Sequence, residues 1–272
     1  MWLTMDGKGA HGMEHGMKVI IATHKRYDMP QDGVYLPVQA GALGKAPLPY
    51  QSDAQGEHIS GRNDLYCELT ALYWAWKNLP AGALGLAHYR RYFGTKRPCA
   101  PWAKPRARIA GGEELAALLE RTPVILPRRR DYVIENRKNQ YIRAHGREGY
   151  DALRETIAER APAYLPAFDA SMRRTAGHCF NMFIMRRDLA DAYCTWMFDI
   201  LFAAEERMRR DCPQAVTPRL MGFLSERLMD CYIETNGYAY AELPVVHMEG
   251  QNWPKKAAAF LARKFGLRGR KG

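Results

Sequence analysis

The sequence predicts an α/β fold: one Rossmann-like domain in which a central, mostly parallel sheet is flanked by helices. Short apolar runs alternate along the chain with longer segments of helical periodicity, an order typical of such sheets. The runs 19–22 and 83–87 are apolar without alternation, which indicates strands buried on both faces. No internal repeat or low-complexity linker divides the chain. We expect one domain over residues 18–254, a disordered leader over 1–17 and a basic amphipathic tail over 255–272.

In the first half of the chain, the clearest element is a helix over 64–78. Leu65, Leu69, Leu72 and Trp76 recur at helical spacing, and they place one apolar face against the sheet. Asn63 or Asp64 can cap the start of this helix and Pro80 ends it. The other elements expected here are a strand over 18–25, an irregular segment over 27–62, a strand over 83–88, a helix near 113–121 and a strand over 123–127.

In the second half, two long helices are expected. Asp188 is the expected cap of a helix over 188–208. Thr217 followed by Pro218 signals the start of another helix, over 218–235, and Gly237 signals its end. The remaining expected elements are helical patches within 131–179, of which 151–160 is the clearest, and strands over 180–185 and 239–246.

The composition is that of a soluble globular protein. The 272 residues are 47% hydrophobic and 25% charged, and no apolar run is long enough for a membrane-spanning helix. Residues 1–17 lack the apolar centre of a signal peptide. The six cysteines form no CxxC pair and no zinc spacing, so we interpret them as reduced thiols of a cytoplasmic protein.

Much of the positive charge lies in the tail. Residues 255–272 carry seven basic residues and no acidic ones, so the rest of the chain holds only 11 − 7 = +4 of the net charge of +11. A basic amphipathic segment suits the surface of an anionic membrane, and a frayed, solvated terminus is the alternative. Because the excess charge is terminal and not spread over a patterned face, we expect no nucleic-acid partner.

Basic and polar side chains follow several predicted strands. Thr23, His24 and Lys25 end the first strand, and 83-ALGLAHYRRYFG-94 passes from apolar residues to His88, Tyr89, Arg90, Arg91 and Tyr92. Ligands of open α/β sheets bind beyond the carboxyl ends of the strands, and arginine recognises phosphate groups. The ligand expected there is an anion, with solvated strand ends as the alternative. The other basic strand ends are Arg128–Arg130 and His247.

Several familiar catalytic motifs are absent from the sequence. It contains no GxxxxGK[ST] loop, no GxGxxG after the first strand, no GxSxG and no HExxH. Tyr141 and His145 share one face if this segment is helical, and the alternative to a functional pair is a satisfied surface histidine. Glu226 lies about 200° from the apolar stripe of its helix at 100° per residue. It therefore points to solvent or to a cleft, where it could act as a base.

Long strings of the sequence resemble an uncharacterised-domain family found in bacterial capsular and exopolysaccharide gene clusters, whose members are regarded as GT-A-like glycosyltransferases. The resemblance covers roughly residues 18–246, and some members are assigned galactofuranosyl transfer from a uridine diphosphate sugar. The strings are 60-SGRNDLYCELTALYWAWKNL-79, 85-GLAHYRRYF-93, 181-NMFIMRRDLADAYCTWMFDIL-201, 219-RLMGFLSERL-228 and 242-ELPV-245.

The resemblance implies a nucleotide-sugar pocket at this strand edge. In GT-A folds an Asp-x-Asp pair usually holds a divalent metal there; here His88, Arg90 and Arg91 take its place. We therefore expect no metal site and no required cofactor, with Mn²⁺ or Mg²⁺ as the alternative. Glu226 would be the catalytic base. The donor contacts expected are Thr23, His24, Lys25, Asp53, Asn63, His88, Arg90, Arg91, Asn181 and His247, and the acceptor contacts are Tyr141 and His145.

The function expected is a hexosyltransferase that moves a sugar from a nucleotide-diphosphate donor to a hydroxyl of a growing bacterial surface polysaccharide. The donor expected is linked to uridine diphosphate, with galactofuranose as a candidate sugar. The acceptor would be a glycan or lipid-linked glycan, and the enzyme would be cytoplasmic, with peripheral contact to the inner face of the membrane through 255–272. The alternative is a non-catalytic nucleotide-sugar or glycan-binding protein on the same fold.

Overall fold

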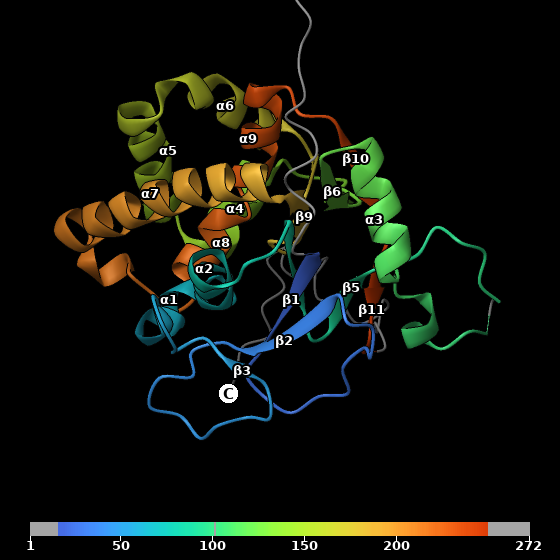
Figure 1. The fold of residues 1–272 in the computed structure, drawn as a ribbon. Coiled ribbons are helices and arrows are strands. Elements are labelled where there is room, and N and C mark those ends of the chain that lie inside the picture. The colour runs from blue at the N-terminus through green and yellow to red at the C-terminus, as the bar shows by residue number, and fades with distance from the viewer. Residues whose placement is uncertain (1–15, 101, 250–272) are drawn as a thin grey trace, which may run out of the picture.

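The computed structural model describes residues 16–100 and 102–249. These residues form a nine-stranded sheet and the helices around it (Figure 1). The main path of the sheet runs β10-β6-β9-β4-β1-β2-β3, and β5 and β11 form a ribbon beside β4. The strands are β1 (Met17–Thr23), β2 (Tyr35–Gln39), β3 (Gln51–Ser52), β4 (Ala83–His88), β5 (Arg91–Phe93), β6 (Val124–Pro127), β9 (Phe183–Arg186), β10 (Tyr240–Leu243) and β11 (Val245–His247). A separate two-stranded sheet pairs β7 (Arg130–Asp131) with β8 (Ala176–Gly177).

Strand directions give the sheet one edge at which several chain segments end. β1 is parallel to β2 and β4, β2 to β3, and β6 to β10. β9 is antiparallel to both β4 and β6, so it begins at the edge where β4 and β6 end. The predicted mixed α/β fold, with a central, mostly parallel sheet flanked by helices, is confirmed.

Helices cover both faces of this sheet (Figure 1). α3 packs on one face, with Leu115 and Leu119 in the smaller apolar cluster, while α2 and α5–α9 contribute to the larger cluster on the other. The helices are α1 (Asn63–Tyr66), α2 (Leu69–Asn78), α3 (Gly112–Arg121), α4 (Arg137–His145), α5 (Glu148–Arg160), α6 (Leu165–Arg173), α7 (Arg187–Asp211), α8 (Leu220–Ser225) and α9 (Leu228–Asn236), with 3-10 turns at Ser60–Arg62, Pro105–Arg108, Pro162–Tyr164 and Pro213–Ala215.

The central strands are buried on both faces, as their apolar runs predict. In β1, Ile20 belongs to the larger apolar cluster, whereas Val19 and Ile21 belong to the smaller one. β4 divides in the same way, with Leu84 and Leu86 on one side and Ala83 and Ala87 on the other.

Two helices expected to be continuous are interrupted. The helix predicted over 64–78 is α1 and α2, separated at Cys67, whose φ of 51° and ψ of −125° are not helical. The helix predicted over 218–235 is α8 and α9, separated at Glu226 and Arg227, and it starts two residues later than expected because Arg219 is left-handed (φ 69°). The end at Gly237, with φ 65°, is as predicted.

The segment 27–62, expected to be irregular, contains β2 and β3. Pro37 lies within β2 in register with Ile21 of β1, while β3 pairs only with Val38 and Gln39. Among the described residues no strand pairs with Pro37 on its other side, so the proline costs β2 no hydrogen bond to them. The sequence prediction was wrong because Pro in a strand is uncommon.

Two strand predictions also need correction. The strand predicted over 180–185 begins only at Phe183, because Phe180 and Asn181 both have positive φ. The strand predicted over 239–246 divides into β10 and β11 around Pro244.

Parts of the predicted domain plan lie outside the described residues. The tail 255–272 is one, and so is the leader up to residue 15, whereas Met17 is the first residue of β1. Within the described chain, no helix combines the length and the apolar character required to cross a bilayer. All six cysteines are free thiols.

Candidate active site

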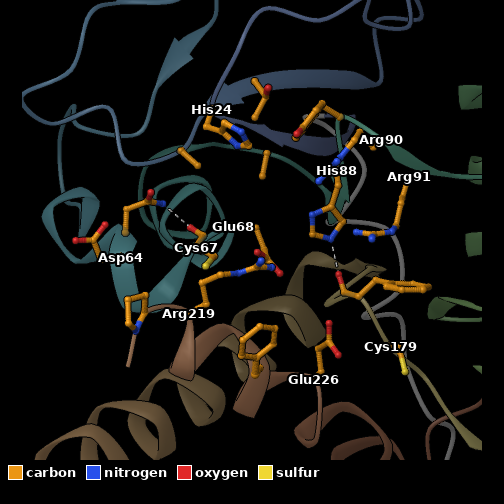
Figure 2. A pocket seen from close by; sticks show the side chains of 18 of the residues that line it. His24, Asp64, Cys67, Glu68, His88, Arg90, Arg91, Cys179, Arg219 and Glu226 are labelled. Atoms are coloured by element: carbon orange, nitrogen blue, oxygen red, sulfur yellow. Dashed lines mark hydrogen bonds between the residues drawn. The ribbon is translucent and has the colours of Figure 1, made fainter. Parts of the chain in front are cut away.

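A pocket of about 730 Å³ opens at the edge where β1, β2, β4 and β6 end and β9 begins (Figure 2). This volume is in the range of small-molecule binding sites. Its wall is rich in charged groups: Lys45, Arg90, Arg91, Arg130, Arg219 and Arg227 against Asp64, Glu68 and Glu226. The predicted meeting of basic strand ends at one edge is confirmed for His24, His88, Arg90, Arg91 and Arg130.

The turn between β4 and β5 places three cationic or polar side chains on the pocket wall. His88 and Arg91 are paired across the turn, and His88 Nε2 is hydrogen-bonded to the carbonyl of Phe180. The Arg91 guanidinium lies 4.7 Å from the Phe180 ring centroid. Burial, and then the charge of Arg90, lower the pKa of Arg91. Arg90 Nη1 lies 3.2 Å from Glu249 Oε2.

The two tyrosines of this string serve the core. Tyr89 and Tyr92 are buried, at 6% and 0% exposure. The edges of their rings pack against other aromatic rings, Tyr89 against His24 at 5.3 Å and Tyr92 against Tyr35 at 5.9 Å between centroids. The buried phenols therefore pack around the turn that presents the two guanidiniums, and Tyr89 also lines the pocket.

Glu226 lies at the interruption between α8 and α9 and lines the pocket. Its side chain is 19% exposed, and Oε2 lies 3.6 Å from Arg227 Nη2. Arg137 Nη2 donates to the Glu226 carbonyl at 3.1 Å, which fixes the backbone beneath the carboxylate. Of the two orientations that the periodicity left open, solvent or cleft, the structure has the cleft (Figure 2).

The end of β1 also reaches the pocket, through Thr23 and His24. The buried Thr23 hydroxyl donates to the Lys25 carbonyl at 2.7 Å, which shapes the turn after the strand. Burial first, and then the charges of Lys25, Arg90 and Lys45, lower the pKa of His24. Lys25 itself is not among the lining residues; its ammonium lies 5.2 Å from the Tyr89 ring centroid.

Asn63 lines the pocket, whereas Asp53 does not. Asp53 is fully buried and accepts hydrogen bonds from Gly41 N (2.7 Å), Ala42 N (2.9 Å) and Ser60 Oγ (2.5 Å). A Cβ at Gly41, where φ is 65°, would lie 2.3 Å from Asn63 Cγ. Asp53 therefore stabilises the turn at Gly41, where the absence of a side chain leaves room for Asn63. The prediction that Asp53 contacts the donor needs correction, because Asp53 does not line the pocket.

Asn181 and His247 also lie away from the pocket wall. The Asn181 amide donates to Glu68 Oε1 at 2.8 Å and to the Gly222 carbonyl at 3.0 Å, so it ties the segment before β9 to α8. His247 is in register with Arg91 across β5 and β11 and lines a second cavity of about 430 Å³. Each supports an element that carries a lining residue.

The predicted pair of Tyr141 and His145 divides between the core and the pocket. Tyr141 is fully buried. His145 lines the pocket and stacks on Phe223, with 4.0 Å between ring centroids. Burial, and then the charges of Arg227 and Arg219, lower the pKa of His145. The two residues do lie one turn apart on a helix, as predicted, but Tyr141 is in the core and His145 is at the pocket.

Comparison with known proteins gives this chain a family and a structural relative. A family model matches residues 18–237, most of the chain. The chain belongs to this family, the Domain of unknown function (DUF4422). Among solved structures, the DUF4422 chain is similar to the WbbM bifunctional glycosyltransferase in its apo form, with a TM-score of 0.75 and 25% sequence identity. The similarity covers 87% of this chain and 46% of that one, so this chain spans about half the length of that protein. No curated protein matches the chain.

The pocket of this DUF4422 chain also contains charged residues that the sequence did not single out. Lys45 comes from the loop after β2, Glu68 from the interruption between α1 and α2, and Arg219 and Arg227 from the two ends of α8. Only Arg227 had a local signal, since it directly follows Glu226. The other three come from loops and helix ends whose paths the periodicity does not give.

The side chains of the pocket determine whether a metal ion could be held there. Within the described ranges, no group of three or more His, Cys, Asp or Glu side chains is arranged to hold a metal ion. The pocket carboxylates instead have basic or amide neighbours, such as Arg227 beside Glu226 and Asn181 on Glu68. Neither Glu226 nor Glu68 therefore belongs to a preformed group of metal ligands among the described residues.

Proposed function

We propose that this protein is a glycosyltransferase that transfers a sugar from a nucleotide-diphosphate donor to a hydroxyl group of a glycan. The observation that carries the proposal is that Glu226, Arg90 and Arg91 line one pocket. That pocket lies at the carboxyl edge of an α/β sheet, in a chain similar to a bifunctional glycosyltransferase. A base and a set of fixed cations are the two components that displacement of a diphosphate requires.

In this proposal Glu226 accepts the proton of the acceptor hydroxyl as that oxygen attacks the sugar. The guanidiniums of Arg90 and Arg91 stabilise the negative charge that develops on the departing diphosphate. His24 and Asn63, which lie at the ends of β1 and of the 3-10 turn before α1, would contact the nucleotide. In this proposal the guanidiniums take the place of a metal ion, and Mn²⁺ or Mg²⁺ dependence is the alternative to test.

The substrates proposed rest on the family resemblance. The donor is a uridine diphosphate sugar, with galactofuranose as the candidate, and the transfer is of the hexosyl class. The acceptor is a growing bacterial surface polysaccharide or its lipid-linked precursor, reached from the cytoplasmic face of the membrane. A non-catalytic nucleotide-sugar or glycan-binding protein on the same fold is the competing hypothesis.

The first prediction separates an enzyme from a binding protein. Glu226→Gln removes the base but keeps the size of the side chain, so transfer should fall about 10²–10⁴-fold. Binding of uridine diphosphate, measured by calorimetry, should stay within about threefold. Glu120→Gln on the exposed side of α3 is the matched control and should change neither quantity. Unchanged turnover in Glu226→Gln would refute the role of this carboxylate.

The second prediction tests the cationic clamp. Arg90→Ala and Arg91→Ala should each lower transfer about 10²–10³-fold, because fixed donors at a developing charge contribute several kcal/mol. The control is Arg121→Ala, an exposed arginine at the end of α3. Transfer by the unmodified protein should be unaffected by excess EDTA. A strict requirement for manganese would contradict the clamp while leaving a glycosyltransferase in place.

A further inference from the structure

The pocket has a second end that the proposed donor contacts do not use. We name it the arginine end and define it by Arg130, Tyr132, Gln140, His145, Cys179 and Arg227. These residues come from the segment after β6, from α4, from the segment before β9 and from the end of α8. Figure 2 shows Cys179 on the far side of the pocket from Asp64 and His24.

Arg227 is the residue at this end whose state requires an explanation. Only 2% of it is exposed, yet it lines the pocket. Its Nε and Nη1 are buried and have no hydrogen-bond partner within the described chain. The guanidinium lies 5.6 Å from the Tyr141 ring centroid, and its one carboxylate neighbour, Glu226, is 3.6 Å away. A buried guanidinium with unmet donors is costly unless something binds it.

The unmet groups of the arginine end are complementary to an anionic sugar. Gln140 Oε1 is also buried without a partner among the described residues, so it can accept a hydrogen bond from a hydroxyl group of a ligand. Arg130 adds a second, exposed guanidinium beside Tyr132, at 5.1 Å from its ring centroid. Two guanidiniums and an amide oxygen recognise a carboxylate or phosphate next to a hydroxyl.

The position of Arg227 indicates which substrate carries that anion. A donor nucleotide held at His24 and Asn63 lies at the other end of the pocket. A group bound to the unpaired Nε or Nη1 of Arg227 is close to Glu226, because Nη2 of the same guanidinium is 3.6 Å from Glu226 Oε2. The base of a transferase must lie within hydrogen-bond reach of the acceptor hydroxyl. An acceptor bound through Arg227 satisfies that requirement.

We propose that the arginine end is the acceptor subsite and that it binds a sugar carrying a carboxylate or a phosphate. This inference rests on the proposed function, since it takes the other end of the pocket as the donor site. It adds that the acceptor is an acidic glycan or a sugar phosphate and that Arg227 and Arg130 select it.

The test uses the full chain saturated with uridine diphosphate, so that the donor end is filled. Glucuronate, glucose 1-phosphate and methyl glucoside are titrated separately and followed by ligand-observed NMR. At least one anionic sugar should bind tenfold or more tightly than the neutral glucoside. Arg227→Gln should weaken that binding about 10–100-fold, the range for hydrogen bonds to a charged group. Arg130→Gln, on the exposed guanidinium, should weaken it about threefold and keeps the test valid if Arg227→Gln fails to fold.

Arg121→Gln is the matched control, because Arg121 is exposed at the end of α3 and does not line the pocket. It should leave binding of the anionic sugar unchanged. Preference for glucuronate would assign a carboxylate, and preference for glucose 1-phosphate a phosphate. Equal binding of all three sugars, with uridine diphosphate still bound, would overturn the inference alone. An equal loss of uridine diphosphate binding in Arg227→Gln would place Arg227 on the donor and also overturn it. If uridine diphosphate fails to bind while the anionic sugar binds, the proposed donor is wrong and the inference stands.

Discussion

At the scale of single residues, His24 and His145 are two pocket imidazoles that lie in a cationic setting. Burial lowers the pKa of both histidines. The charges of Lys25 and Arg90 lower the pKa of His24 further. The charges of Arg227 and Arg219 do the same for His145. Both rings are therefore neutral at pH 7, and an anionic ligand would favour their protonation by offsetting these cations.

The third prediction follows from these two histidines. Their pKa is about 6.5 in the unfolded chain and lower in the folded one, so the unfolded state binds more protons as the pH falls through this range. Folding stability should therefore decrease from pH 7.5 to pH 5.5. The melting temperature, measured across this window, should fall less in the double variant His24→Gln/His145→Gln. Identical slopes in the two proteins would contradict this assignment.

At the scale of elements, the interruption between α8 and α9 is held by a buried ion pair. Arg137 Nη1 donates to Asp230 Oδ2 at 2.6 Å, with the two side chains 0% and 1% exposed. Although burial alone would raise it, the hydrogen bond from His178 and the charge of Arg137 lower the pKa of Asp230 to about 2. Because Arg137 also donates to the Glu226 carbonyl, the pair fixes the backbone that carries the proposed base.

The fourth prediction is that Asp230→Asn destabilises the fold strongly. The substitution leaves Arg137 charged and buried without its counter-ion, which typically costs about 3–5 kcal/mol. Asp199→Asn is the control, because it breaks the Arg160–Asp199 pair, whose side chains are 49% and 48% exposed. That change should cost under about 1 kcal/mol. Equilibrium urea unfolding measures both, and equal effects would contradict a structural role for the buried pair.

The limits of prediction from the sequence are clearest in these interruptions. Periodicity gave part of the apolar face around Cys67, where Leu69 and Leu72 are buried but Leu65 and Trp76 are only half-buried. It could not give the non-helical backbone at Cys67 or the left-handed Arg219, because tertiary contacts stabilise these conformations. One such contact is the bond from Arg219 N to the Asp64 carbonyl at 2.6 Å, which joins segments far apart in the sequence.

At the scale of the whole molecule, strand order explains which site residues could be predicted. His24, His88 and Arg91 follow strands that end at the same edge of a largely parallel sheet, so a topological rule was sufficient. Asp53 and Tyr141 were misplaced because their depth depends on side-chain packing: Asp53 binds the turn at Gly41, and Tyr141 is fully buried. A polar residue that is close in sequence to predicted pocket residues can therefore stabilise the backbone around the pocket instead of lining it.

The last prediction concerns charge outside the described residues. Residues 255–272 carry seven basic residues and no acidic ones, and each cation near an anionic bilayer contributes on the order of 1 kcal/mol. Removing this tail should abolish co-sedimentation with phosphatidylglycerol vesicles while leaving transfer to a soluble acceptor unchanged. The full chain should bind these vesicles less as salt rises, because screening weakens the attraction, and it should not bind phosphatidylcholine vesicles. A shortened protein that still co-sediments would assign membrane contact to the domain itself, and steeply salt-dependent binding to DNA by the full chain would favour a nucleic-acid partner instead.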